Sequence, residues 1–256
     1  MEKNVIYESK GSIGRIFLND PENSNPISLY VLRDLIEAFR ASSEKGDICV
    51  IYGAKGKNFT FGANLKDGYD LIMNQERRSE AVEDLWSWQE LTSVMLEHPG
   101  VIITGYHGWI VGGGFEHTLC SDIRIASETT KIMLPELDLG IFFSNASLKL
   151  LPGIVGMGRA KEMMLMGGVM KAEEALEIGL VNRVCADNEL DSVLQEYAEK
   201  IASKDPFAVR TFKRLINKAQ ESTIDEVLYR EYRAMVQTGQ SGGAEKRIGA
   251  FLKMNR

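Results

Sequence analysis

The sequence predicts an α/β fold in which short strands are followed by helices, with a run of helices at its C-terminal end. In the first half of the chain, two short apolar or alternating runs repeatedly precede a segment with helical periodicity. This alternation is typical of α/β architectures. After residue 187 only helical periodicity remains. With 256 residues, 44% of them hydrophobic, the chain is long enough for one large domain with an ample buried interior.

The first unit of the fold is expected to contain two strands and one helix. Residues 5–9 and 13–18 have the apolar and alternating patterns of strands. Pro26 and Ser28 then mark the start of a helix that continues to about Ser43.

A second and a third unit repeat this order. The second consists of a strand at residues 49–53, a glycine-rich loop or short strand to about residue 70, and a helix at residues 79–97 that ends before Pro99. The third consists of a strand at residues 101–106, a turn at 108–114, a short apolar helix to about residue 120 and a strand at 123–126. We expect the chemistry of the protein in this third unit.

Helices dominate the remaining chain. The expected helices cover residues 144–151, a segment from 158, residues 171–179, 190–203, 206–219 and 223–238 and a terminal segment, with one strand at residues 181–185. The last helices have apolar faces without strands of their own to cover. We therefore place a soft boundary near residue 195, between a core at residues 1–195 and a C-terminal helical region at residues 196–256 that packs on the core or on another subunit.

Composition and charge narrow the class of protein. No run of eighteen apolar residues occurs, so we expect no membrane-spanning helix. A formal charge of -6 without a dense Lys/Arg block argues against a nucleic-acid surface. The start MEKNVIYESK lacks the apolar stretch of a secretory signal, so a cytoplasmic location is expected. Cys49, Cys120 and Cys185 lie far apart without metal-ligand spacing and are expected to be reduced core residues.

The strongest local feature is the segment GWIVGGGFE at residues 108–116, between an apolar strand and an apolar helix. Consecutive glycines allow unusual backbone angles and let a ligand approach bare N–H groups. A helix that starts there directs its free N–H groups at the turn, which favours a developing negative oxygen. The spacing does not match the dinucleotide fingerprint, because His117 stands where a third glycine is needed, and no P-loop occurs. Taken alone, the run is equally compatible with tight packing of a helix on a strand.

A second glycine-containing loop, FTFGANLK at residues 59–66, also follows a strand. It can supply a second backbone N–H that faces the first, because an oxyanion hole needs two convergent donors. It can also be an ordinary surface loop. Lys55, Lys57 and Lys66 form a small basic cluster here, and the sequence alone favours solvated charges over phosphate contacts.

Two glutamates stand in apolar surroundings. Glu116 lies between Phe115 and Leu119, and Glu136 follows Pro135 in the apolar run IMLPELDLG. An acid is expensive to bury without a purpose or a partner. If the two converge on one site, their pKa values move apart and give one acid and one base near neutral pH. The alternative for each is a buried helix-cap or salt-bridge acid, which the sequence favours equally.

Other side chains offer weaker candidates. The three histidines form no metal-binding pattern and no serine lies in a GxSxG motif, so metal and serine-hydrolase mechanisms rank low. His117 is expected to face another side of the helix than Glu116, in a structural or surface role. His107, beside the glycine turn, is a minor candidate. Trp86 and Trp88 are interpreted as core residues.

Four segments extend the pattern: FTFGANLKD, GYHGWIVGGGFEHTLCSDIRIASE, LPELDLGI and MKAEEALEIGLVNRV. In this order they resemble the enoyl-CoA hydratase/isomerase (crotonase) family over nearly the whole chain. Several matched segments at matching separations are more specific than any single glycine run. The resemblance implies a crotonase fold, a spiral of strand-strand-helix turns whose C-terminal helices build trimers, often paired as hexamers. It also implies an acyl-CoA ligand and no metal or redox cofactor.

The resemblance also implies roles for individual residues. The N–H groups of Ala63 and Gly113 match the oxyanion hole that polarises the thioester carbonyl. The segment implied to run along the CoA moiety consists of Ala63, Asn64, Leu65 and Lys66. Glu116 and Glu136 match the two acid positions of the hydratases, which hold a water between them. In that scheme Glu116 helps to deprotonate the water for attack at the β-carbon, and Glu136 gives a proton to the α-carbon.

Departures from the family pattern bear on the acyl group. Ser144, followed by Asn145, stands where hydratases usually have a glycine that lines the acyl and water pocket, and its hydroxyl can bind water or a polar acyl group. Asn64 replaces the aspartate common after the oxyanion alanine. The implied function is that of a lyase, a 2-enoyl-CoA hydratase. The alternatives are a Δ3-Δ2 enoyl-CoA isomerase in which Glu136 alone shuttles a proton, another crotonase-type reaction, or a non-catalytic acyl-CoA-binding protein.

Overall fold

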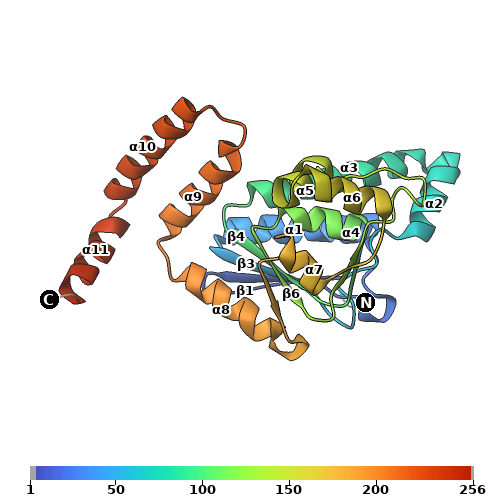
Figure 1. Ribbon diagram of the computed structural model, residues 1–256, viewed down its shortest axis with the longest axis horizontal. Coiled ribbons are helices and arrows are strands. Elements are labelled where there is room, and N and C mark those ends of the chain that lie inside the picture. Colours follow the sequence, from blue (N-terminus) through green and yellow to red (C-terminus); the bar gives the residue numbers. More distant parts are fainter. Residues whose placement is uncertain (1–3, 255–256) are drawn as a thin grey trace.

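A six-stranded sheet forms the centre of the computed structural model, which describes residues 4–254 (Figure 1). Its strands are β1 (Val5–Lys10), β2 (Ile13–Leu18), β3 (Cys49–Ala54), β4 (Val101–Tyr106), β6 (Ile123–Ser127) and β9 (Arg183–Cys185), in the spatial order β1-β2-β3-β4-β6-β9. Only the β1–β2 pair is antiparallel among these neighbours. The α/β class and the order of the strands along the chain are as the sequence predicts.

Helices pack on both faces of this sheet (Figure 1). The helices are α1 (Leu29–Lys45), α2 (Leu65–Met73), α3 (Arg78–Glu97), α4 (Gly113–Glu116), α5 (Ser147–Val155), α6 (Met157–Met166), α7 (Ala172–Glu177), α8 (Leu190–Ala202), α9 (Pro206–Ala219), α10 (Ile224–Gln240) and α11 (Gly243–Met254). Alternation along β3 explains the layering, because successive strand residues point to opposite faces. Val50 and Tyr52 join the core beneath α1 and α3, whereas Cys49 and Ile51 join the core beneath α8.

A second, three-stranded sheet was not expected from the sequence. It consists of β5 (Trp109–Val111), β7 (Lys131–Met133) and β8 (Met170–Lys171), in the order β5-β7-β8. The expectation of a turn throughout residues 108–114 was wrong, because Trp109–Val111 form strand β5. Strands of two or three residues are too short to show an alternation of apolar and polar residues. They can be recognised only from the strands with which they pair.

Two further expectations require correction. Residues 65–73 form helix α2, although the sequence analysis expected a loop or short strand there; the Asn64 side chain caps this helix by accepting the N–H of Asp67 at 3.2 Å. Trp86 is not a core residue, since its exposed fraction is 68%, whereas Trp88 is buried as expected. The two tryptophans lie on different sides of α3 because residues two apart on a helix face different directions.

Helices α9, α10 and α11 extend away from the sheet (Figure 1). A buried ion pair joins them to the core: Lys213 Nζ lies 2.8 Å from Asp122 Oδ2 and donates to the carbonyl of Gly100 at 2.8 Å. Beyond this contact, the three helices leave large apolar side chains exposed: Phe212, Ile216, Leu228, Tyr232, Met235 and Phe251. The division into two domains near residue 195 stays a prediction.

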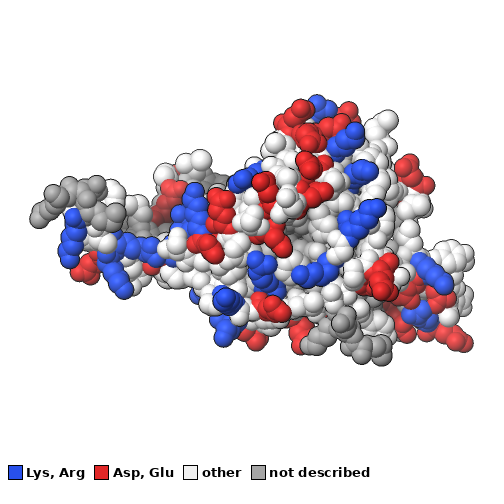
Figure 2. All heavy atoms as spheres, turned by 90° about the horizontal axis from the view of Figure 1, so that it is seen from below, with Lys and Arg blue, Asp and Glu red and all other residues white. Residues whose placement is uncertain are grey.

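The three cysteines are buried, and the surface carries charges of both signs (Figure 2). Cys49, Cys120 and Cys185 are free and buried, which confirms the prediction of reduced core residues. On the face shown in Figure 2, Lys and Arg side chains are interspersed with Asp and Glu. Between residues 4 and 254, no helix has the length and apolar character needed to cross a membrane.

Candidate active site

Three chain segments from different units run side by side at the small sheet. Thr60 forms a parallel bridge with Ile110 of β5, and Ile110 pairs in turn with Ile132 of β7. The segment after residue 60 and the segments that leave β5 and β7 therefore emerge at the same end. This register brings together residues around positions 63, 113 and 136, which are far apart in the sequence.

Two glycines are required where these segments meet. A Cβ at Gly114 would lie 2.4 Å from Thr60 Cγ2 and 2.9 Å from the Cα of Gly62, so the two backbones touch without room for a side chain. Gly112 has a φ of 55°, which favours glycine, and a Cβ there would lie 2.7 Å from Glu136 Oε1. The glycine run thus allows the second loop and the Glu136 carboxyl to approach the start of α4.

The N–H groups of Ala63 and Gly113 are free of protein acceptors. In the bridge between Ile27 and Ala63, the N–H of Asn64 and the carbonyl of Gly62 bond to Ile27, so the N–H of Ala63 points to the opposite side. Gly113 is the first residue of α4 and has no helical carbonyl behind it. Throughout residues 4–254, neither N–H donates a hydrogen bond to the protein.

The two predicted acids lie in one place. Glu116 ends α4, Glu136 lies in the turn after β7, and both are buried, with exposed fractions of 1% and 3%. Their carboxyl groups are close enough for each to influence the pKa of the other. The backbone turn that carries Glu136 is fixed because its carbonyl accepts the N–H groups of Leu139 and Ile141.

The two carboxyls have different partners. Glu116 Oε2 accepts the N–H of Ser144 at 2.7 Å and the hydroxyl of Ser147 at 2.5 Å. Glu136 Oε2 is buried and accepts no hydrogen bond from the described residues. Burial raises the pKa of both groups, and the nearby Glu136 raises that of Glu116 further. The pair therefore retains one proton near neutral pH, and the donors of Ser144 and Ser147 stabilise negative charge on Glu116.

The sequence had singled out Ser144 for its hydroxyl, but its backbone holds Glu116. The Ser144 hydroxyl accepts a hydrogen bond from the side-chain Nδ2 of Asn145 at 2.7 Å, and the side-chain Oδ1 of Asn145 accepts the hydroxyl of Thr92 from α3 at 3.1 Å. Asn145 is fully buried with a φ of 54°, a conformation that asparagine tolerates better than most residues. This chain of contacts fixes the loop that donates to Glu116.

Sequence reasoning missed Ser147 and Thr92. Both act through contacts across more than 25 residues of sequence, Ser147 with Glu116 and Thr92 with Asn145. A lone serine or threonine next to a helix is common, so neither carries a local signal. The only available hint for Ser147 was its position three residues after the already noted Ser144.

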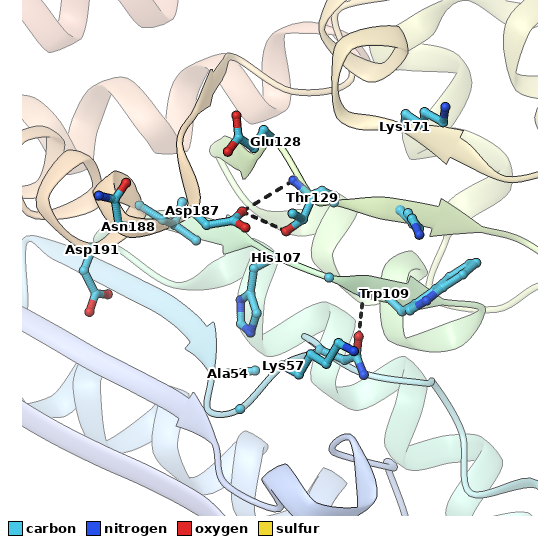
Figure 3. A pocket seen from close by; sticks show the side chains of 16 residues that line it. Ala54, Lys57, His107, Trp109, Glu128, Thr129, Lys171, Asp187, Asn188 and Asp191 are labelled. Carbon is cyan, nitrogen blue, oxygen red and sulfur yellow. Dashed lines mark hydrogen bonds between the residues drawn. The ribbon is translucent and has the colours of Figure 1, made fainter.

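A hollow of about 920 Å³ lies elsewhere, at the carboxyl ends of β3, β4 and β6 (Figure 3). It contains two residues noted in the sequence, Lys57 and His107, but neither glutamate. Its lining mixes both charges: Lys57, Lys131, Lys171, Glu128, Asp187 and Asp191. Lys55 instead lies over the ring of Phe17, 4.5 Å from its centroid, so the basic residues do not gather into one phosphate site.

Comparisons with known proteins agree on one family. The family model for enoyl-CoA hydratase/isomerase matches residues 8–255. The chain is 30% identical to the short-chain-enoyl-CoA hydratase of Clostridium acetobutylicum, over 99% of this chain and 96% of that protein. It is also 30% identical to the mitochondrial Delta(3,5)-Delta(2,4)-dienoyl-CoA isomerase of Mus musculus, over 87% and 71%. The crystal structure of an enoyl-CoA hydratase from Bacillus anthracis superposes with a TM-score of 0.91 at 29% identity, over 98% and 97% of the two chains.

The buried carboxyl pair predicts a loss of stability as the pH rises. Burial raises the pKa of both carboxyls, that of Glu116 from 4.5 to about 8, so the folded protein keeps a proton on the pair that the unfolded chain has released. For a raised carboxyl pKa, the stabilisation is complete below pH 4.5 and is lost as the pH rises through about 8. In this window we expect the free energy of unfolding to fall by up to about 1.4 kcal/mol per pH unit.

Denaturant unfolding of the wild-type protein and Glu116→Gln, at equal protein concentration over this pH range, measures the effect. The glutamine cannot titrate, so its stability should depend less steeply on pH. Parallel curves for the two proteins would show that the carboxyl pair does not hold the proton.

Proposed function

The chain belongs to the enoyl-CoA hydratase/isomerase (crotonase) family, and we propose that it is a lyase that adds water across the α,β double bond of a 2-enoyl-CoA thioester. One observation carries the proposal: two buried carboxyls that influence each other's pKa lie at the start of α4, where the N–H groups of Ala63 and Gly113 have no acceptor among the described residues. A pure binding site has no evident need for such a pair, because burying acids is costly.

The two N–H groups would hold the thioester oxygen. Addition to the double bond moves negative charge onto this oxygen, and donors fixed in advance stabilise the enolate-like state. Each such donor contributes roughly 3 to 4 kcal/mol in comparable sites. The hydrogen bonds from Phe115 and Glu116 to the Gly112 carbonyl, at 2.8 and 3.0 Å, fix the peptide that carries the Gly113 N–H. This donor is therefore oriented before a substrate binds.

The carboxyl pair would supply the proton chemistry. Glu116, held as the anion by two donors, takes a proton from a water while the water oxygen bonds to the β-carbon. Glu136 gives its proton to the α-carbon, so one O–H bond of water is broken and a 3-hydroxyacyl-CoA forms. The proton now on Glu116 passes to Glu136, which restores the starting state. A positioned carboxyl of this kind contributes about 10²- to 10⁴-fold in rate.

The loop that contains Ala63 would also contact the rest of CoA. Ala63 is followed by the cap residue Asn64 and then by α2, whose first two residues, Leu65 and Lys66, are exposed. This segment therefore borders solvent where the long CoA moiety would run. Asn64 is occupied as a helix cap, so in this chain we assign it to shaping the loop. We propose that the reaction needs no metal or redox cofactor and that CoA enters only as part of the substrate.

An isomerase is the second candidate function, and one observation favours it. Glu136 Oε2 lacks a partner among the described residues, so this carboxyl is free to take a proton from one carbon and return it to another. Such a reaction requires Glu136 and the N–H pair but no water activated by Glu116.

Substitution of each acid separates the two functions. For a hydratase, Glu116→Gln and Glu136→Gln should each lower kcat for crotonyl-CoA hydration by about 10²- to 10⁴-fold, because each step needs its own carboxyl. Loss of the conjugated absorbance of crotonyl-CoA measures hydration, with saturated butyryl-CoA as the control. If Glu116→Gln abolishes hydration but keeps the migration of a 3-enoyl double bond, isomerisation is the main activity. If the wild-type protein turns over neither substrate yet gains thermal stability with CoA thioesters, it is a binding protein.

We also propose that the protein is a homotrimer, or a hexamer of paired trimers. The exposed apolar side chains of α9, α10 and α11 support this, because a contiguous apolar surface is costly to leave in water. Sedimentation equilibrium should give three or six times the mass of 28.6 kDa. Met235→Glu, at an exposed fraction of 75%, should shift the distribution toward smaller species, whereas Lys200→Glu on α8 should not. A monomeric wild-type protein would contradict the proposal.

A further inference from the structure

His117 links the central sheet to the start of α4. It follows Glu116 directly and is fully buried, so the surface role considered from the sequence is wrong. Both ring nitrogens have partners: Nε2 lies 2.9 Å from the Tyr52 hydroxyl, and Nδ1 lies 3.0 Å from the carbonyl oxygen of Gly113. Tyr52 lies on β3, so the contact joins the rigid sheet to the residue with the second free N–H.

Hydrogen-bond chemistry allows one arrangement of protons in this chain. The Gly113 carbonyl can only accept, so Nδ1 must carry the hydrogen and donate it. In a neutral imidazole Nε2 is then an acceptor, and the Tyr52 hydroxyl must be its donor. Burial lowers the pKa of His117 to about 4 and raises that of Tyr52, so the ring stays neutral and the hydroxyl stays protonated at physiological pH.

The contact adds to the restraint on the start of α4: Phe115 and Glu116 already hold the Gly112 carbonyl, and His117 holds the carbonyl of Gly113, in the next peptide. Gly112, Gly113 and Gly114 lack side chains and have the widest conformational freedom. The Gly113 carbonyl accepts both the ring Nδ1–H and the backbone N–H of His117. A Cβ at Gly113 would lie 3.3 Å from the Trp88 ring, whose centroid is 6.1 Å from that of the His117 ring. Gly113 therefore has an indole and an imidazole close to it.

We propose that Tyr52 and His117 form a positioning relay that holds the Gly113 N–H in line with the substrate's thioester oxygen. The inference rests on the proposed function, because it assigns the relay to one donor of the oxyanion hole. Neither residue touches the reacting atoms. Tyr52 fixes the tautomer of His117, and His117 fixes Gly113.

A matched pair of substitutions tests the relay. Tyr52→Phe removes the donor to His117. The control Tyr106→Phe also removes a fully buried hydroxyl, which lies 2.6 Å from Thr118 Oγ1 on the residue after His117. Both variants lose one buried hydrogen bond, so they should lose comparable stability. Only Tyr52→Phe should disturb the oxyanion donor.

Three measurements separate positioning from stability. Tyr52→Phe should lower kcat for crotonyl-CoA by on the order of 10-fold with KM changed less than about 2-fold, a part of the 10²- to 10³-fold cost of losing one donor outright. A bound cinnamoyl-CoA chromophore, whose absorbance moves to longer wavelength as its carbonyl is polarised, should lose part of that shift. The ¹⁵N resonances of His117 should change from a single Nδ1–H tautomer to a mixture. Tyr106→Phe should retain all three wild-type properties.

A second pair covers the case in which Tyr52→Phe does not fold. His117→Asn keeps a donor near the position of Nδ1, whereas His117→Leu has none, so Asn should retain more of kcat and of the spectral shift. The inference is wrong if Tyr52→Phe and Tyr106→Phe behave alike, if Asn and Leu behave alike, or if wild-type His117 carries its hydrogen on Nε2. A wild-type protein that neither binds nor polarises the chromophore would instead contradict the proposed function, and the ¹⁵N result would still decide the tautomer.

Discussion

The site depends on the register in which three chain segments lie against one another. The bridge between Thr60 and Ile110 and the pairing of Ile110 with Ile132 fix where each segment leaves the small sheet. A shift by one residue would turn the N–H of Ala63 toward Ile27 and move Glu136 away from Gly112. The glycines at 112 and 114 make this register possible, because any larger residue would push the segments apart. Backbone pairing therefore sets the geometry of the chemistry before any side chain contributes.

Glu116 and Glu136 have the same side chain but different electrostatic surroundings. Burying two carboxyls is unfavourable for folding, and burial raises the pKa of both; the nearby Glu136 raises that of Glu116 further. The backbone of Ser144 and the hydroxyl of Ser147 stabilise charge on Glu116 alone, while Glu136 keeps an oxygen without a donor among the described residues. In the proposed mechanism, this difference in partners would make Glu116 the base and Glu136 the acid. The hydrogen bonds from Thr92 through Asn145 to Ser144 hold in place the loop that donates to Glu116.

The sequence predicted the parts of the fold that have a period or a conspicuous residue. The strands of the large sheet and the long helices were predicted because five or more residues repeat one pattern, and Glu116 and Glu136 were noticed because acids interrupt apolar runs. Strands β5, β7 and β8 are too short to show a period. Ser147 and His117 gain their roles only through distant partners, Glu116 and Tyr52, which a sequence does not place beside them. The local pattern therefore predicted which residues lie together, and the tertiary contacts determine how they are held.

The most direct test of this account is a crystal structure with acetoacetyl-CoA, whose thioester group resembles that of the substrate but which has no double bond to hydrate. We expect the thioester oxygen to lie about 3 Å from both the Ala63 and Gly113 nitrogens, a normal hydrogen-bond distance. The α- and β-carbons should face the carboxyls of Glu116 and Glu136. A thioester bound in another cavity, or held by only one of the two N–H groups with the acids turned away from its carbons, would contradict the central claim.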